Sequence, residues 1–261
     1  MPDAPCDASR RQWNGIAMIG FKGFFAGQAS GPDFTEIAAW AERGGHRFKR
    51  ERDGRGFVVD GEFSGTPWRL EWGASQRAYI MGHELRLRAD LRLPPDLQML
   101  MLSRSLLDTL EKEAFDQITE NNQTELGGAT PEETRWLTMF PKIQLGASRL
   151  MRAAYGGVCS LPEEGPAWIE GPLENALLRA AGTLLRAQPP FALMTLRGKL
   201  YLRMQLAGAD ETDIAAALAL FETASNEARR VGKARADEPV SWSSTLSTAW
   251  HNSVPGQGVD K

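Results

Sequence analysis

Apolar and polar residues alternate over residues 46–93, and this period of two predicts β-strands. Turn-forming residues divide the stretch into four runs, at 47–52, 57–63, 68–72 and 79–91. Strands joined by such short connections pair antiparallel with their neighbours along the chain. We therefore predict an antiparallel β-meander, with one apolar face against a core and one polar face in solvent.

The same alternation assigns individual side chains to the two faces of the predicted meander. The apolar face includes Trp68, Leu70, Trp72, Leu85 and Leu87, which we expect inside the core. The polar face carries Arg69, Glu71, Glu84, Arg86, Arg88 and Asp90. His83 falls on the apolar side, so it is adjacent to Glu84 in sequence but faces the other way.

Apolar residues spaced by three and four predict helices around the strands. We expect these helices at 34–43, 103–121, 131–140, 172–187 and 211–231, with a hairpin at 191–206 that turns at Gly198-Lys199. The apolar run 97–102 fits either a strand that closes the sheet or the start of the following helix. The predicted fold class is α+β, an antiparallel β-meander flanked by helices and followed by a C-terminal helix-hairpin-helix lobe and a flexible tail.

This pattern divides the chain into four parts. Residues 1–30 form an apolar, glycine-rich N-terminal arm, and 31–145 form the α+β meander lobe. Residues 146–233 form the helix-hairpin-helix lobe, and 234–261 form a polar tail with tryptophan anchors. The two central parts are expected either as one α+β domain or as two packed lobes.

Composition narrows the class of protein. The chain has 261 residues, 42% of them hydrophobic, which excludes disorder of the whole chain. Its net charge of -3 predicts no binding of nucleic acid. The longest apolar stretch, 15–27, is too short for a membrane span of roughly 20 residues, and Lys22 interrupts it. We predict a cytoplasmic protein of bacterial type, with export through the segment containing Arg10 and Arg11 as the alternative.

The sequence carries few signs of catalytic chemistry. It contains no GxSxG, GxxxxGK, GxGxxG or HExxH motif, and its two cysteines, Cys6 and Cys159, are too few for a disulfide framework. We predict no cofactor and no metal. His83 is a weak catalytic candidate, because a general base needs a second polar group to hold it and Glu84 faces away. The alternative is a neutral histidine that hydrogen-bonds to the backbone.

Three arginines alternate with acids on the polar face of the meander. Arg69, Arg86 and Arg88 are candidate binding residues, since a guanidinium offers a planar fork of donors to a carboxylate or phosphate. The interleaved acids compete for the same donors. The alternative is therefore a solvated ladder of cross-strand ion pairs with no ligand.

The tail contains apolar residues that its polar composition does not explain. Trp242, Leu246 and Trp250 are four residues apart, so a helix of about two turns would align them on one face. Such residues are typical of anchors that dock into a groove, either of the same chain or of a partner.

Together these features favour a non-enzymatic cytoplasmic protein that binds or assembles with a protein partner. The alternative is an enzyme, a hydrolase or transferase, that uses His83 with a nearby carboxylate.

Overall fold

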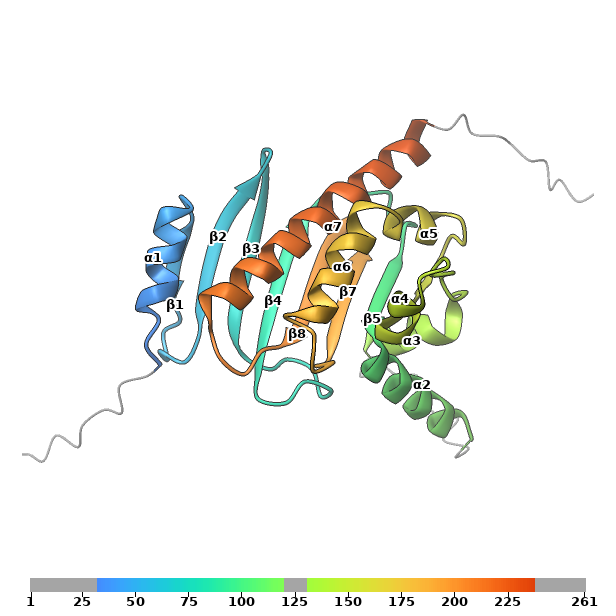
Figure 1. Cartoon of the computed structure of the whole chain (residues 1–261), viewed down its shortest axis with the longest axis horizontal. Helices are drawn as coiled ribbons and strands as arrows, with labels where there is room; N and C mark the ends of the chain where they lie inside the picture. The colour runs from blue at the N-terminus through green and yellow to red at the C-terminus, as the bar shows by residue number, and fades with distance from the viewer. Residues whose placement is uncertain (1–31, 120–130, 238–261) are drawn as a thin grey trace, which may run out of the picture. The chain divides into compact units, whose positions relative to one another are not determined.

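An antiparallel sheet organises the residues that the computed structural model describes, 32–119 and 131–237 (Figure 1). Its eight strands within these ranges are β1 (Arg47–Arg50), β2 (Phe57–Phe63), β3 (Thr66–Ala74), β4 (His83–Asp90), β5 (Met99–Ser103), β6 (Tyr155–Cys159), β7 (Phe191–Leu196) and β8 (Lys199–Gln205). Their order in the sheet is β1-β2-β3-β4-β8-β7-β5-β6. The predicted α+β class and the predicted meander of β1 to β4 are confirmed.

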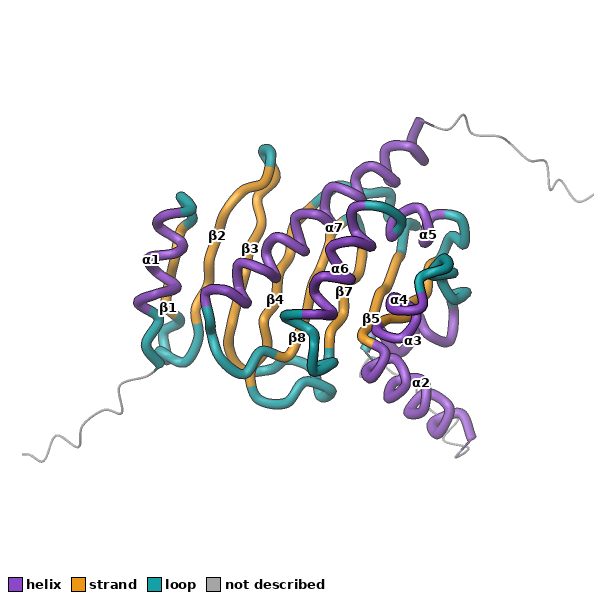
Figure 2. Tube along the Cα trace, in the orientation of Figure 1, coloured by secondary structure: helices purple, strands orange, loops and turns teal. Residues whose placement is uncertain are grey.

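Helices complete the fold around this sheet (Figure 2). They are α1 (Thr35–Arg43), α2 (Arg104–Thr119), α3 (Glu132–Met139), α4 (Arg149–Ala154), α5 (Glu164–Ile169), α6 (Pro172–Gly182) and α7 (Glu211–Asp237). The last helix continues beyond the expected end near residue 231. Three of its buried positions are alanine, Ala217, Ala224 and Ala228, and these small side chains allow close approach to the sheet.

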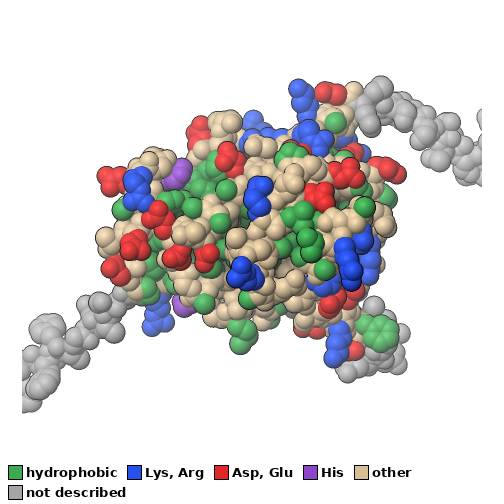
Figure 3. All heavy atoms as spheres, viewed as in Figure 1, with side chains coloured by type: hydrophobic (Ala, Val, Ile, Leu, Met, Phe, Trp, Pro, Cys, Tyr) green, Lys and Arg blue, Asp and Glu red, His purple; other side chains and the backbone are tan. Residues whose placement is uncertain are grey.

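The main core lies between the sheet and a layer that contains α1, α5, α6 and α7. The meander residues expected inside are buried there, with Trp68, Leu70, Trp72, Leu85 and Leu87 at most 3% exposed. This confirms the assignment of faces by alternation. On the outer side of the helical layer, basic and acidic side chains are interspersed (Figure 3).

A second, smaller core lies on the opposite face of the sheet. There α2 and α3 cover only the end of the sheet formed by β5, β6 and β7. Strand β5 is consequently buried on both faces, with Met99 and Met101 in the main core and Leu100 and Leu102 in the second. A strand buried on both faces has a nearly continuous apolar sequence, which explains why Met99, Leu100, Met101 and Leu102 show no alternation.

The structure corrects two details of the expected elements. Residues 79–82 precede β4 as part of a loop, and Met81 is exposed. Residues 155–159, for which the sequence pattern predicts no strand, form β6. Gly157 permits this pairing, because a Cβ there would lie 2.1 Å from the Leu100 carbonyl oxygen.

The C-terminal hairpin joins the meander directly. β7 and β8 connect through Arg197 and Gly198, one residue earlier than the expected Gly198-Lys199 turn. Both residues have positive φ, as a tight hairpin turn requires. β8 then pairs with β4, so strands from both predicted lobes belong to one sheet. The predicted N-terminal arm and most of the tail lie outside the described residues.

Candidate ligand-binding face

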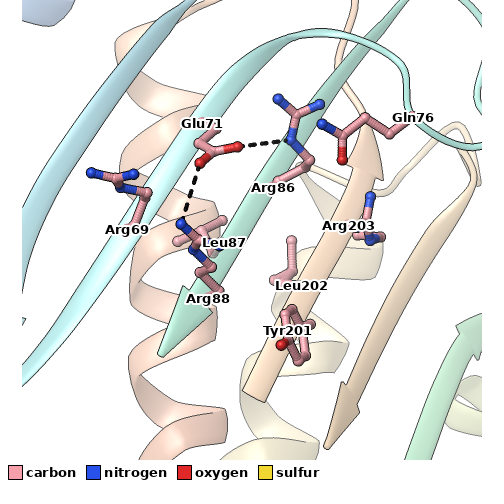
Figure 4. Close-up of a pocket in the computed structure, with 9 residues that line it drawn as sticks. All are labelled: Arg69, Glu71, Gln76, Arg86, Leu87, Arg88, Tyr201, Leu202 and Arg203. Atoms are coloured by element: carbon pink, nitrogen blue, oxygen red, sulfur yellow. Dashed lines mark hydrogen bonds and ion pairs between the residues drawn. The ribbon is translucent and has the colours of Figure 1, made fainter. Parts of the chain in front are cut away.

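One surface of the sheet combines charged side chains from three strands that are distant in sequence. It lies on β3, β4 and β8 (Figure 4), on the side of the sheet opposite α7, and it borders the second core, against which Tyr201 packs. We call it the arginine face and define it by Arg69, Glu71, Glu84, Arg86, Arg88, Tyr201 and Arg203. A hollow of about 80 Å³ lies among these side chains.

Glu84 is the centre of the arginine face. Its side chain is fully buried, although alternation placed it on the solvent-exposed side of β4. Oε1 accepts a hydrogen bond from Arg203 Nη1 at 2.6 Å, and Oε2 accepts one from the Gln76 backbone N–H at 2.8 Å. Arg86 Nη1 approaches Oε2 at 3.4 Å. The carboxylate therefore holds two guanidinium groups and one end of the loop before β4.

Glu71 holds the outer part of the same face. Its carboxylate accepts from Arg86 Nε at 3.2 Å and lies 3.8 Å from Arg88 Nη2 (Figure 4). Arg86 also donates to the Ala74 carbonyl oxygen at 3.0 Å. Arg86 is thus fixed from three sides, whereas the Arg88 side chain is 56% exposed.

Arg69 is paired at the edge of the face toward β2. Its Nε and Nη2 donate to the two carboxylate oxygens of Asp60, at 2.7 and 3.1 Å. These bonds from Arg69 lower the pKa of the Asp60 carboxyl below its ordinary value, since they favour the charged form. The geometry is the bidentate pairing typical of arginine with a carboxylate.

The predicted binding residues Arg69, Arg86 and Arg88 do lie together, and the structure adds Tyr201 and Arg203. Both come from β8, whose own alternation places them on one face. The register of β4 against β8 sets Arg86 opposite Arg203 and Arg88 opposite Tyr201. That register joins residues more than 100 positions apart, and no local pattern encodes it.

A second buried carboxylate lies beside this face. Glu133, at the start of α3, is fully buried and accepts from Tyr79 Oη at 2.9 Å and Arg77 Nε at 3.2 Å. Burial and the neighbouring Glu133 raise the pKa of the Tyr79 phenol, so the hydroxyl stays protonated as a donor. Glu133 thereby ties α3 to the loop that frames the arginine face.

His83 lies away from these groups, on the core side of β4. Its ring stacks on the Trp72 indole, with centroids 4.3 Å apart and planes at 7°. The enzymatic alternative requires a carboxylate paired with His83. Among the described residues, no carboxylate forms a hydrogen bond or ion pair with it. The other predicted anchors, Trp242, Leu246 and Trp250, lie outside the described residues.

Two further features bear on the class of site. Within residues 32–119 and 131–237, no group of histidine, cysteine and acidic side chains could hold a metal ion. No helix in this part of the chain combines the length and apolar character that crossing a membrane requires.

Comparison with known proteins gives little further information. No protein-family model and no curated protein matches the chain. Among solved structures, the crystal structure of the mycobacterial trehalose monomycolate transport factor A, TtfA, is similar with a TM-score of 0.42 and 9% sequence identity. The match covers 74% of this chain and 92% of that one, and a similarity this low does not indicate function.

Proposed function

We propose that this protein is a non-enzymatic binding protein that holds a protein partner on the arginine face. The observation that carries the proposal is a pair of guanidinium groups, those of Arg86 and Arg203, which Glu71 and Glu84 fix beside the exposed Arg88 on a part of the sheet that no described helix covers. Fixed donors lose little conformational entropy when a ligand binds. A pre-organised charged surface of this kind supports recognition.

The shape of the surface favours a macromolecular partner over a small substrate. Small-molecule sites are typically clefts of about 300–1,000 Å³ that enclose most of their ligand. The hollow on the arginine face measures about 80 Å³, room for one group that projects from a larger molecule. The net charge of -3 argues against a nucleic acid as that molecule.

A comparison of variants in the native host tests the proposal. The tagged full-length protein, the variant Arg88→Glu and the matched control Arg179→Glu are used for affinity capture followed by mass spectrometry. Arg179 is an exposed arginine of α6, on the helix-covered side of the sheet. We expect one set of captured proteins to be lost with Arg88→Glu and retained with the control. Identical capture by all three proteins would exclude the arginine face as a partner site.

The same proposal places the protein in the cytoplasm. Cys159 is a free, buried thiol, which is compatible with a reducing compartment. Cell fractionation with N-terminal sequencing of the isolated protein tests this location. Recovery outside the cytoplasm with the segment around Arg10 and Arg11 removed would overturn it.

A further inference from the structure

The arginine face contains more hydrogen-bond donors than its own acids engage. A guanidinium has five N–H groups. Arg88 donates no hydrogen bond to any residue within 32–119 or 131–237, and its one ion-pair contact there, with Glu71, is long at 3.8 Å. Arg203 uses only Nη1, toward Glu84, and Arg86 leaves Nη2 unused among the described residues. These donors surround the hollow from two strands.

The strand register adds an electrostatic cost that the acids only partly offset. Arg69 is directly opposite Arg88, and Arg86 is directly opposite Arg203. Like charges in such positions destabilise a sheet. Around the hollow, the guanidinium groups of Arg69, Arg86, Arg88 and Arg203 meet three carboxylates, those of Asp60, Glu71 and Glu84, which leaves one positive charge. A ligand with a single negative charge at this point would complete the balance.

The basic surface continues beyond the hollow toward β1. A second, wider depression of about 450 Å³ shares Arg69 with the first. Its other charged lining residues are three basic ones, Lys49, Arg50 and Arg52, and two acidic ones, Glu51 and Asp53, so its charge is also positive on balance. The path from β8 to β1 crosses four strand spacings, or roughly 19 Å, which an extended peptide of about six residues spans. A ligand that follows this path meets positive charge at both ends.

From these observations we infer that the arginine face binds an acidic polypeptide segment, with one aspartate or glutamate carboxylate seated between Arg88 and Arg203. The inference rests on the proposed function and specifies the chemistry of the partner. A carboxylate matches the planar donor fork of arginine, and its single charge matches the charge left over in the hollow. A phosphate dianion carries two negative charges, one more than the positive charge left over in the hollow.

Peptide binding to the purified full-length chain tests the inference. The probes are fluorescein-labelled hexaglutamate, hexaglutamine of the same length and a phosphoserine hexapeptide, measured by fluorescence anisotropy at about 50 mM salt, where screening is weak. We expect hexaglutamate to bind, hexaglutamine to show no binding, and the affinity for hexaglutamate to fall as salt increases.

Variants then locate the binding. Arg88→Gln should weaken hexaglutamate binding about tenfold, the effect of losing one charge-assisted hydrogen bond. Arg88→Lys should restore part of the loss, and the control Arg179→Gln should match the parent protein. Arg203→Lys is a second variant in the hollow that keeps a positive charge beside Glu84. Thermal melting confirms that each variant is folded.

Several results would overturn the inference. The first is that hexaglutamate does not bind, and the second is that the parent and Arg88→Gln bind hexaglutamate equally well. The third is that the phosphoserine peptide binds at least about tenfold more tightly than hexaglutamate. If hexaglutamate does not bind while partner capture still depends on Arg88, only the inference is wrong. If peptide binding depends on Arg88 while capture does not, the proposed function is wrong.

Discussion

Replacing Glu84 with glutamine should destabilise the fold and loosen the arginine face together. The substitution preserves size but replaces one carboxylate oxygen with an NH₂ group. Because Oε1 and Oε2 both accept hydrogen bonds, the NH₂ group must face a donor in either orientation. Arg203 would also lose its ion pair with the Glu84 carboxylate, which is its only carboxylate partner among the described residues.

The size of the effect follows from the burial of the groups. Removing one partner from a buried ion pair costs about 3–5 kcal/mol. Here Glu84 is fully buried, but the side chains of Arg86 and Arg203 are 12% and 17% exposed and retain some contact with water. We therefore expect Glu84→Gln to lower the free energy of unfolding by about 2–4 kcal/mol. With an m-value of about 2 kcal/mol per M, the urea midpoint should fall by about 1–2 M.

Urea denaturation followed by tryptophan fluorescence measures this change. The control is Glu62→Gln, an exposed residue of β2, which should change stability by less than about 0.5 kcal/mol. In the Arg203→Gln background, Glu84→Gln should cost less than it does in the parent chain, because the two side chains are coupled. A midpoint for Glu84→Gln equal to that of the control would show that Glu84 does not hold the arginines.

Three further predictions concern other parts of the chain. Burial lowers the pKa of His46 below its ordinary 6.5, so as the pH falls the unfolded chain takes up a proton before the folded chain does. The free energy of unfolding should therefore fall as the pH drops below about 6.5. NMR titration of the ring measures this pKa, and a value at or above 6.5 would contradict the prediction. Burial raises the pKa of the Cys159 thiol to about 11, so in a Cys6→Ser variant the native protein should resist a thiol reagent that reacts readily after denaturation. Deleting residues 238–261 should either lower the melting temperature or remove a captured partner; if neither changes, the segment from Trp242 to Trp250 is not an anchor.

The pattern of residues along the chain was enough to predict strands β1 to β4 and the faces of the residues in β3 and β4. Alternation in 68–72 and at the polar positions of β4 depends only on the geometry of an extended chain, in which successive side chains point to opposite sides. Alternation therefore predicts Trp68 and Trp72 in the core, and together with the antiparallel pairing of β3 and β4 it predicts Arg69, Arg86 and Arg88 on one surface.

How the meander and the C-terminal hairpin join, and which polar groups are buried, depends on the tertiary structure. The pairing of β4 with β8 joins Glu84 to Arg203 across 119 positions, and periodicity carries no information about such partners. Glu84 lies on the predicted polar face, yet arginines from two strands and the loop at Gln76 enclose it. Its burial is favourable only because these long-range donors replace water around the carboxylate, and that condition exists only in the folded chain.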